Sequence, residues 1–286
     1  GEGSTSSSDG EVPVPARSEG EAAKALVELV VREMHEAQAS AATSPGYLSA
    51  FPESVLERQA DIAGVWAPYY TLHKIGQGLL DAYTVAGSQR ALEVLRGLAD
   101  HITSRVEGII ASKGQEYWFK QAMHYPKAAF GSESGGMNEL AWQLYRVTGE
   151  TKYVVLGSLF DHPKFLGDMA RNADVLSGEH ANFHEPLAVG AAVRHELTGE
   201  PKVKAAAHNL LSMLRRTRSY ATGGTCDGER WQAAGRLESA STSTETQETC
   251  TQVNLERLAA RALGWSDPAA AADWADYSER AALHGA

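Results

Sequence analysis

The feature that most constrains the fold of this chain is a recurring unit in which one helix ends at a glycine and the next helix starts at once. The unit reads DAYTVAGSQRAL, QLYRVTGETKYV and RHELTGEPKVKA, with a looser copy in ARALGWSDPAAA. Its glycines are Gly87, Gly149, Gly199 and Gly264. A glycine at the end of a helix adopts the left-handed conformation at no steric cost. Helical hairpins that repeat in this way predict an α-solenoid or an α/α toroid.

The stretches between these glycines carry helical periodicity, whereas β-hairpin signals are scarce. Apolar residues recur every three to four positions along 20–42 and 71–86. The side chain of Ser88 is expected to cap the next helix, which should run to about Ile110. The sequence therefore predicts an all-α chain. Its 43% of hydrophobic residues is enough for a sizeable core.

Charge and composition exclude several classes of partner. The net charge is −10 and no run of lysine or arginine occurs, which argues against nucleic acid or an anionic membrane as a partner. No apolar run approaches the roughly 20 residues that span a bilayer, and no signal-type segment is present, so the compartment is not determined. Two cysteines do not make a disulfide scaffold. Residues 1–18 are expected to be a disordered lead-in, and residues 19–286 to form one domain.

The connections predict where a functional site lies. Turns within each helical pair are short, whereas the connections between pairs, at 43–70, 111–135, 161–185 and 217–248, are long. Because the helices alternate in direction, the long connections should all emerge at one end. Aromatic, histidine and acidic residues gather in these connections, as is typical of binding and catalytic loops. They are Trp66, Tyr69, Tyr70, Trp118, His124, His162, His180, His184, Glu229, Trp231 and Glu248. A helical scaffold with a protein-binding face remains the alternative.

Two motifs indicate contacts to sugar hydroxyls. In WAPYYTLHK, Trp66 and Tyr69 are of the type that stacks on sugar rings, and His73 follows in the first helical turn, although aromatics near a helix start are more often core. In SGEHANFHEP, two histidines and an asparagine lie in what is expected to be a loop bounded by Gly and Pro. They suit hydroxyl contacts or zinc, but the segment lacks the HExxH spacing of a helical zinc motif.

Two further motifs carry acid–base and metal chemistry. SYATGGTCDGERW places Glu229 near Trp231, where an apolar pocket would favour a protonated carboxyl, although a solvated loop glutamate is the plainer interpretation. In ETC, Glu248 and Cys250 are two residues apart. A thiolate and a carboxylate suit Zn²⁺, yet a site normally needs four ligands, and a lone helical cysteine is most often a small buried residue.

Taken together, these segments resemble glycoside hydrolase family 127, the β-L-arabinofuranosidase type, and its near relatives. The matching pieces occur in the order of the family and cover nearly everything from about residue 44 to the end. They are GYLSAFP, WAPYYTLHKIGQGLLDAY, ESGGMNELAWQLYRVTG, LFDHPKFLG, LSGEHANFHEP, SYATGGTCDGERW, ETC and ADYSERA.

The resemblance implies a fold and a chemistry. The fold would be an (α/α)6 toroid followed by β domains. The activity would be retaining hydrolysis of non-reducing-end β-L-arabinofuranosides or related plant or algal sugars. Glu229 would be the general acid/base, Glu248 and Cys250 would be zinc ligands, and a zinc-held cysteine thiolate would be the nucleophile. The residues expected to contact the sugar are Trp66, Tyr69, His73, Asn138, Glu139, His180, Asn182, His184 and Trp231.

The chain departs from the family pattern in one respect that bears on activity. The other two zinc ligands of the family are an adjacent Cys-Cys pair, one of which is the nucleophile, and no such pair occurs here. Nor do β domains follow, so the toroid and the zinc site are expected to be incomplete. Cys226 is a second thiol near Glu229 and a possible substitute ligand. Three functions stay open: a glycosidase domain, a noncatalytic carbohydrate-binding relic, and a helical scaffold for a protein partner.

Overall fold

The structure, a computed structural model, describes residues 18–41, 44–119, 133–238, 243–246, 248–266, 273, 276, 277 and 279. These ranges contain helices and no β-strand, so the all-α prediction is confirmed. The expected lead-in and His124 lie outside the described residues, apart from Ser18. The helices are α1 (Glu19–Ser40), α2 (Ser54–Ala60), α3 (Pro68–Thr84), α4 (Gln89–Lys113), α5 (Gln115–Tyr117), α6 (Met137–Thr148), α7 (Lys152–Leu159), α8 (Pro163–Ala170), α9 (Ala181–Thr198), α10 (Pro201–Thr217) and α11 (Thr249–Leu263).

The helix boundaries follow largely from local chemistry. Ser18 and Glu21 form a capping box at the start of α1, and Pro68 opens α3 at a position where its missing N–H costs nothing. Gly149 and Gly199 end α6 and α9 with φ values of +71° each, in the left-handed conformation expected of them. These glycines therefore mark the hairpin turns, as the repeat predicted.

Two details of the helix ends differ from expectation. Ser88 occupies the N-cap position of α4, but its side chain makes no capping hydrogen bond, and its hydroxyl is buried without a partner in the described part of the chain. Gly264, in the looser fourth copy, has a φ of −68° and does not adopt the left-handed conformation. The helix after Ser88 also runs three residues beyond Ile110, to Lys113.

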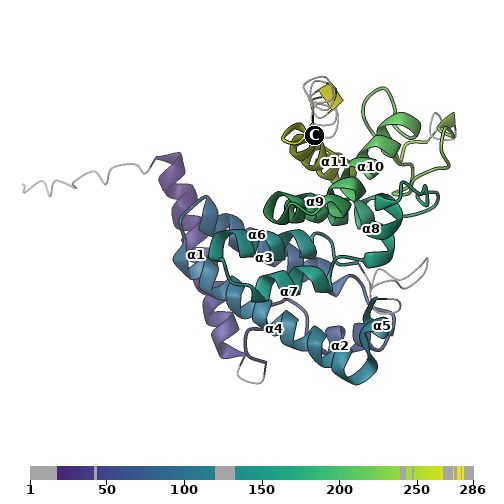
Figure 1. Cartoon of the computed structure of the whole chain (residues 1–286). Helices are drawn as coiled ribbons and strands as arrows, with labels where there is room; N and C mark the ends of the chain where they lie inside the picture. The colour runs from purple at the N-terminus through teal and green to yellow at the C-terminus, as the bar shows by residue number, and fades with distance from the viewer. Residues whose placement is uncertain are drawn as a thin grey trace, which may run out of the picture.

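The helices form two layers (Figure 1). Helices α3, α6, α9 and α11 pack side by side in that order as an inner row, and α4, α7 and α10 return antiparallel behind α3, α6 and α9. Helix α1 covers α4 and the flank of α3, at the far end of the array from α11. The arrangement is that of an open toroid of antiparallel hairpins. Every inner helix starts at the end that bears the long connections.

The core consists of two apolar clusters that meet where α6 packs on α9. The first spans residues 31–160 and the second spans residues 165–277. Gly190 of α9 permits the close approach between them, because a Cβ atom there would lie 2.3 Å from the Asn138 amide of α6. Both clusters are fully buried around aromatic side chains, including Tyr69, Trp118 and Phe160 in the first and Trp231 in the second.

The long connections hold more helix than the sequence predicts. Helix α8 forms within 161–185, and α9 begins at Ala181, so Asn182 and His184 lie on a helix and not in a loop. The reason is that Pro186 was interpreted as a loop boundary, whereas α9 accommodates it as an internal proline while the helix packs against α6, α10 and α11. Tertiary packing here outweighs a local breaker signal.

Exposed apolar surface was expected near residues 250–286. Val253 is exposed there, and most of the rest of that stretch lies outside the described residues. At the opposite end of the array, Leu26, Leu29 and Val30 of α1 are also exposed. None of the described helices combines the length and the apolar character needed to cross a membrane.

Candidate active site

Buried polar side chains line the starts of all four inner helices. They are His73 on α3, Asn138 and Glu139 on α6, Asn182, His184 and Glu185 on α9, and Gln252 and Asn254 on α11. Helix N-termini carry a partial positive charge and free N–H groups, so this end of the inner row favours ligands rich in oxygen. The structure thus brings most of the predicted site residues to one end of the array.

A short turn places Glu229 against the start of α9. Asp227 and Arg230 exchange both backbone hydrogen bonds, at 3.0 and 3.2 Å, so Gly228 and Glu229 are the central residues of a tight hairpin turn. Both have positive φ, +56° and +62°, as in the turns that favour glycine or asparagine. A glutamate in this conformation is strained by about 1 kcal/mol, and such strain gathers at functional sites.

The same turn is tied to α9 on one side and to the start of α11 on the other. Ala181 donates its backbone N–H to the Glu229 carbonyl at 2.8 Å, and the Trp231 N–H reaches the Glu179 carbonyl at 3.0 Å. On the other side, the Gly228 N–H donates to the Glu245 carbonyl at 2.9 Å, three residues before Glu248. Backbone pairing therefore joins three segments that are remote in sequence.

The result is a histidine–carboxylate pair at the start of α9. His180 Nε2 lies 3.2 Å from Glu229 Oε2, and His180 Nδ1 accepts the Phe183 N–H that caps the helix. Burial lowers the pKa of His180, although the neighbouring Glu229 charge opposes this effect. The Glu229 side chain is 52% exposed, so its carboxyl is accessible at the surface of this end.

The Glu248–Cys250 pair lies at the start of α11. The Cys250 thiol donates to Glu248 Oε2 at 3.7 Å. Burial and the negative charge of Glu248 raise the pKa of Cys250 to about 11. Burial also raises the pKa of Glu248, and the negative charge of Glu229 is the next cause of this rise.

Cys226 directly precedes the hairpin turn that carries Glu229, and it is more buried than Cys250. Its sulfur is fully buried and lies 3.7 Å from the Thr251 hydroxyl in the first turn of α11. Burial raises its pKa to about 12, which favours the neutral thiol.

The donor atoms at this end fit zinc only in part. Glu248 and Cys250 are adjacent donors of the types that zinc prefers. Within the described ranges, however, no three His, Cys, Asp or Glu side chains lie close enough to hold an ion together. Because a structural zinc normally takes four protein ligands, the described residues do not by themselves make a zinc site.

Glu133, which sequence reasoning missed, faces the predicted acid. Burial, followed by the negative charge of Glu229, raises its pKa to about 7, and Lys74 opposes this rise. Its backbone carbonyl accepts the Tyr70 N–H at 3.2 Å, which ties it to the start of α3. Its place at the head of the ESGGMNEL segment was the available sequence signal.

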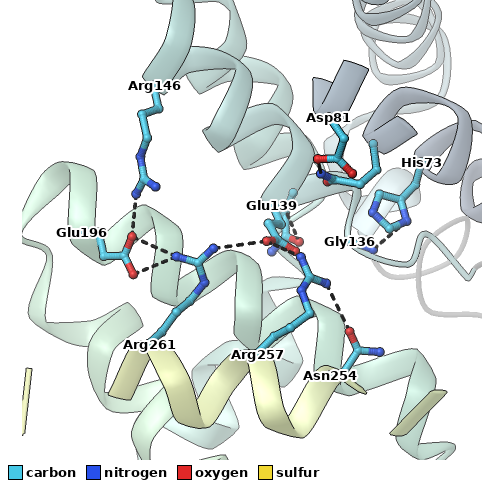
Figure 2. Close-up of polar contacts among 11 residues, drawn as sticks. His73, Asp81, Gly136, Glu139, Arg146, Glu196, Asn254, Arg257 and Arg261 are labelled. Carbon is cyan, nitrogen blue, oxygen red and sulfur yellow. Dashed lines mark hydrogen bonds and ion pairs between the residues drawn. The ribbon is translucent and has the colours of Figure 1, made fainter. Parts of the chain in front are cut away.

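His73 on α3 and Glu139 on α6 are both buried (Figure 2). His73 accepts the Gly136 N–H on Nδ1 at 3.3 Å, and burial lowers its pKa to about 3, so the ring is neutral. Glu139 Oε1 accepts from Arg257 at 2.6 Å and from Arg261 at 3.4 Å. His73 Nε2 and Glu139 Oε2 are both buried without a hydrogen-bond partner in the described part of the chain.

Glu185, also missed, differs from Glu139 in having no partner. It is fully buried on α9, and neither carboxylate oxygen accepts a hydrogen bond from any described residue. Burial raises its pKa well above the usual range. The sequence did not signal this, because the segment SGEHANFHEP was expected to be a loop, where a glutamate would be solvated.

The remaining predicted sugar contacts lie at different depths. Trp66 is 58% exposed and meets Tyr70 edge-on at 6.3 Å between ring centroids. Tyr69 is fully buried against Trp118 and Phe160.

Other members of the predicted set are occupied by contacts within the chain. Trp231 is fully buried, and its indole N–H donates to Thr225. His184 packs on Phe165 at 4.5 Å between ring centroids. Asn138 donates to Asp161 and to the Leu187 carbonyl, both at 3.1 Å, so its amide N–H groups are committed to the protein.

A cavity of about 410 Å³ lies elsewhere, on the face of α4 beside Glu53. His101 and Arg105 line it, and Glu53 approaches them at 3.4 and 3.6 Å. It contains none of the predicted site residues, and Glu53 opposes its positive charge. The cavity is therefore separate from the polar side chains at the starts of the inner helices.

Comparison with known proteins bears on this arrangement. Residues 14–286 match the family described as beta-L-arabinofuranosidase, GH127 catalytic domain. Among solved structures, Ara127N-Se, described as a GH127 beta-L-arabinofuranosidase from Geobacillus stearothermophilus T6, matches with a TM-score of 0.62 and 18% sequence identity. The match covers 93% of this chain but only 43% of that chain, so this chain spans less than half of that protein. The comparison with curated protein sequences finds no match.

Proposed function

The chain belongs to the GH127 beta-L-arabinofuranosidase catalytic-domain family, and from this premise we propose that the loop-bearing end of its inner helices binds an L-arabinofuranoside for glycoside hydrolysis. The single observation that carries the assignment is the pairing of His180 with Glu229, 3.2 Å apart, beside the Glu248–Cys250 pair. A carboxyl, an imidazole and a thiol that meet at helix N-termini are groups that proton transfer at a sugar requires.

Glu229 is proposed as the general acid and base. An exposed carboxyl on a strained turn can approach the glycosidic oxygen, donate its proton as the bond breaks, and then remove a proton from the incoming water. His180 Nδ1 accepts the Phe183 N–H, so the ring proton is left on Nε2, which can donate to the Glu229 carboxyl and orient it. Burial lowers the pKa of His180, which favours this neutral form. The proposed outcome is retention of configuration.

The sugar is proposed to lie between Trp66 and the polar starts of the inner helices. The exposed Trp66 ring offers a flat apolar face for a furanose ring, and its edge contact with Tyr70 keeps it in place. His73, Glu139 and Asn182 lie behind, where a neutral imidazole, a carboxylate and an amide suit sugar hydroxyls.

Glu248 and Cys250 are proposed as two of the ligands of a zinc ion. Zinc, when bound, would hold a cysteine as thiolate. Because the described residues offer only these two adjacent donors, we expect the 286-residue chain to bind zinc weakly and not to hydrolyse aryl β-L-arabinofuranosides. Tight stoichiometric zinc with turnover would contradict this expectation and would favour Cys226 as a further ligand.

Binding calorimetry with methyl β-L-arabinofuranoside on the 286-residue chain tests the proposal. Replacing Trp66 by Ala removes the stacking face and should weaken binding about tenfold, which corresponds to a loss of about 1.4 kcal/mol. Phe51→Ala is the matched control, because Phe51 is also exposed, at 42%, but lies in the connection before α2. Equal effects of the two variants, or no sugar binding at all, would overturn the proposal. Sugar binding without turnover in any longer form of the protein would favour the noncatalytic alternative.

A further inference from the structure

The amide of Asn254, one turn after Cys250 on α11, is occupied at both ends. Its Nδ2 donates to Asn182 Oδ1 at 2.8 Å and to the Cys250 carbonyl at 3.0 Å. Its Oδ1 accepts from Arg257 at 3.4 Å. Asn182 and Asn254 are both buried, so these hydrogen bonds are not readily replaced by water.

The arginine determines which way this amide faces. An asparagine side chain can turn over and exchange its donor and acceptor ends, but a guanidinium offers only donors. With Arg257 beside one end of the Asn254 amide, that end must be the oxygen. Arg257 is held in turn by Glu139 Oε1 at 2.6 Å, which Arg261 also contacts (Figure 2). The polarity of Asn254 is therefore set by an ion pair between α6 and α11 whose carboxylate is buried.

The orientation of the Asn254 amide in turn fixes the orientation of the Asn182 amide. Because Asn254 donates to Asn182 Oδ1, the oxygen of Asn182 is committed to the protein. Its Nδ2 makes no hydrogen bond to any described residue, so the donor end is the one left over. Asn182 lies two residues after His180, the partner of Glu229.

We propose that the Glu139–Arg257–Asn254 chain fixes Asn182 as a hydrogen-bond donor to the sugar, which makes Asn254 and Arg257 positioning residues that select ligand groups able to accept a hydrogen bond. The inference rests on the proposed sugar site for its ligand, but the orientation of the two amides is independent of any ligand. Two experiments separate these parts.

Thermal unfolding of the 286-residue chain tests the orientation. In Asn182→Asp the carboxylate still accepts from Asn254. In Asn254→Asp the carboxylate still accepts from Arg257 and Asn182 turns over to donate, but the hydrogen bond to the Cys250 carbonyl is lost. Each single change should lower Tm by about 3 °C or less. The double variant sets two carboxylates against each other with no donor between them, so its Tm should fall by much more than the sum. Additive shifts would overturn the proposed contact.

Calorimetry tests the effect on the ligand, with methyl β-L-arabinofuranoside and its mono-O-methyl ethers as probes. An ether oxygen accepts a hydrogen bond but cannot donate one. In Asn254→Asp, where Asn182 presents its oxygen, the ether at the contacting position should lose about tenfold more affinity than the parent sugar loses. A merely structural or electrostatic effect would weaken both probes equally.

Asn209→Asp is the matched control for both measurements. It also removes an amide donor from a backbone carbonyl, that of Met169 at 2.9 Å, but on α10, away from the site. It should leave the ratio of the two affinities unchanged. An unchanged ratio in Asn254→Asp would overturn the ligand part of the inference. Absence of sugar binding by the unmodified chain would overturn the proposed function and this part with it, whereas the thermal cycle would still decide the amide orientation.

Discussion

Glu139 and Glu185 lie near the N-terminal ends of neighbouring inner helices, and both are buried, yet their surroundings are opposite. Glu139, on α6, is 1% exposed and accepts from Arg257 and Arg261, both on α11 (Figure 2). Glu185, on α9, is fully buried and has no hydrogen-bond partner among the described residues. Burial raises the pKa of Glu185 well above the usual range.

The difference separates two uses of a buried carboxyl. Glu139 joins helices that are more than one hundred residues apart, so its charge contributes to the register of α6 against α11. Glu185 contributes no such contact, and an unpaired buried carboxyl costs stability, because the group must lose either its charge or its hydration. A residue that a fold keeps at such a cost is a candidate for function.

The largest effect is expected from removing the paired carboxylate. Glu139→Gln should reduce the free energy of unfolding by about 3 kcal/mol, because Arg257 would lose its carboxylate partner and Arg261 would keep only Glu196. Urea unfolding followed by circular dichroism measures this loss. A loss below about 1 kcal/mol would place the ion pair among ordinary surface pairs and would remove the contrast with Glu185.

Glu185→Gln should have the opposite effect and increase the free energy of unfolding relative to the unmodified chain as the pH rises. Since the pKa of Glu185 is raised in the folded state, its contribution to stability is present below the unfolded pKa and is lost as the pH rises toward the folded pKa. The unmodified chain should therefore lose up to about 1.4 kcal/mol per pH unit in that range relative to the variant. Unfolding at pH 5, 6, 7 and 8 measures the slope, and parallel curves for the two proteins would contradict the burial of an unpaired carboxyl.

Glu133 differs from both Glu139 and Glu185, because a second carboxylate, that of Glu229, also raises its pKa. Glu229→Gln removes a negative charge that raises the pKa of Glu133, so Glu133 should titrate below about 7 in the variant. Stability in the unmodified chain is lost as the pH rises through about 7, and in the variant this loss should be smaller and end at lower pH. Carboxyl-carbon NMR titration follows the group directly. An unchanged midpoint would show that Glu229 and Glu133 do not interact.

The smallest effect is expected at the outer end of the same network. Arg146 and Arg261 lower the pKa of Glu196, against the opposing effect of its burial. Glu196→Gln should cost about 1 kcal/mol or less, because these side chains are 20–37% exposed. That stability is present above the unfolded pKa and is lost as the pH falls through the folded one. Measuring Tm against salt concentration checks this, because salt should reduce the difference in Tm between Glu196→Gln and the unmodified chain. A loss of stability as large as that of Glu139→Gln would show that burial of the carboxylate does not distinguish the two ion pairs.

Local chemistry was enough to predict much of the architecture. The glycines at the ends of α6 and α9 and the spacing of apolar residues predicted paired helices. The alternation of short and long connections predicted which end carries the polar residues. The proximity of Glu248 and Cys250 also follows from sequence, because two positions at a helix start cannot lie far apart.

The interactions that define the site depended on tertiary structure. His180 meets Glu229 from 49 residues away because a hairpin turn pairs with the segment before α9. Arg257 reaches Glu139 across 118 residues because α11 and α6 both pack against α9. Pro186 was interpreted as the boundary of a loop, yet helix α9 continues through it because the helix is packed against its neighbours.

The physical reason lies in the range of the forces involved. Helix propensity, capping and glycine conformation act within a few residues, so a sequence determines them directly. Whether a buried glutamate finds an arginine, as Glu139 does, or finds nothing, as Glu185 does, depends on the register between helices. That register is set by the summed packing of many side chains, and no short segment of the sequence contains it.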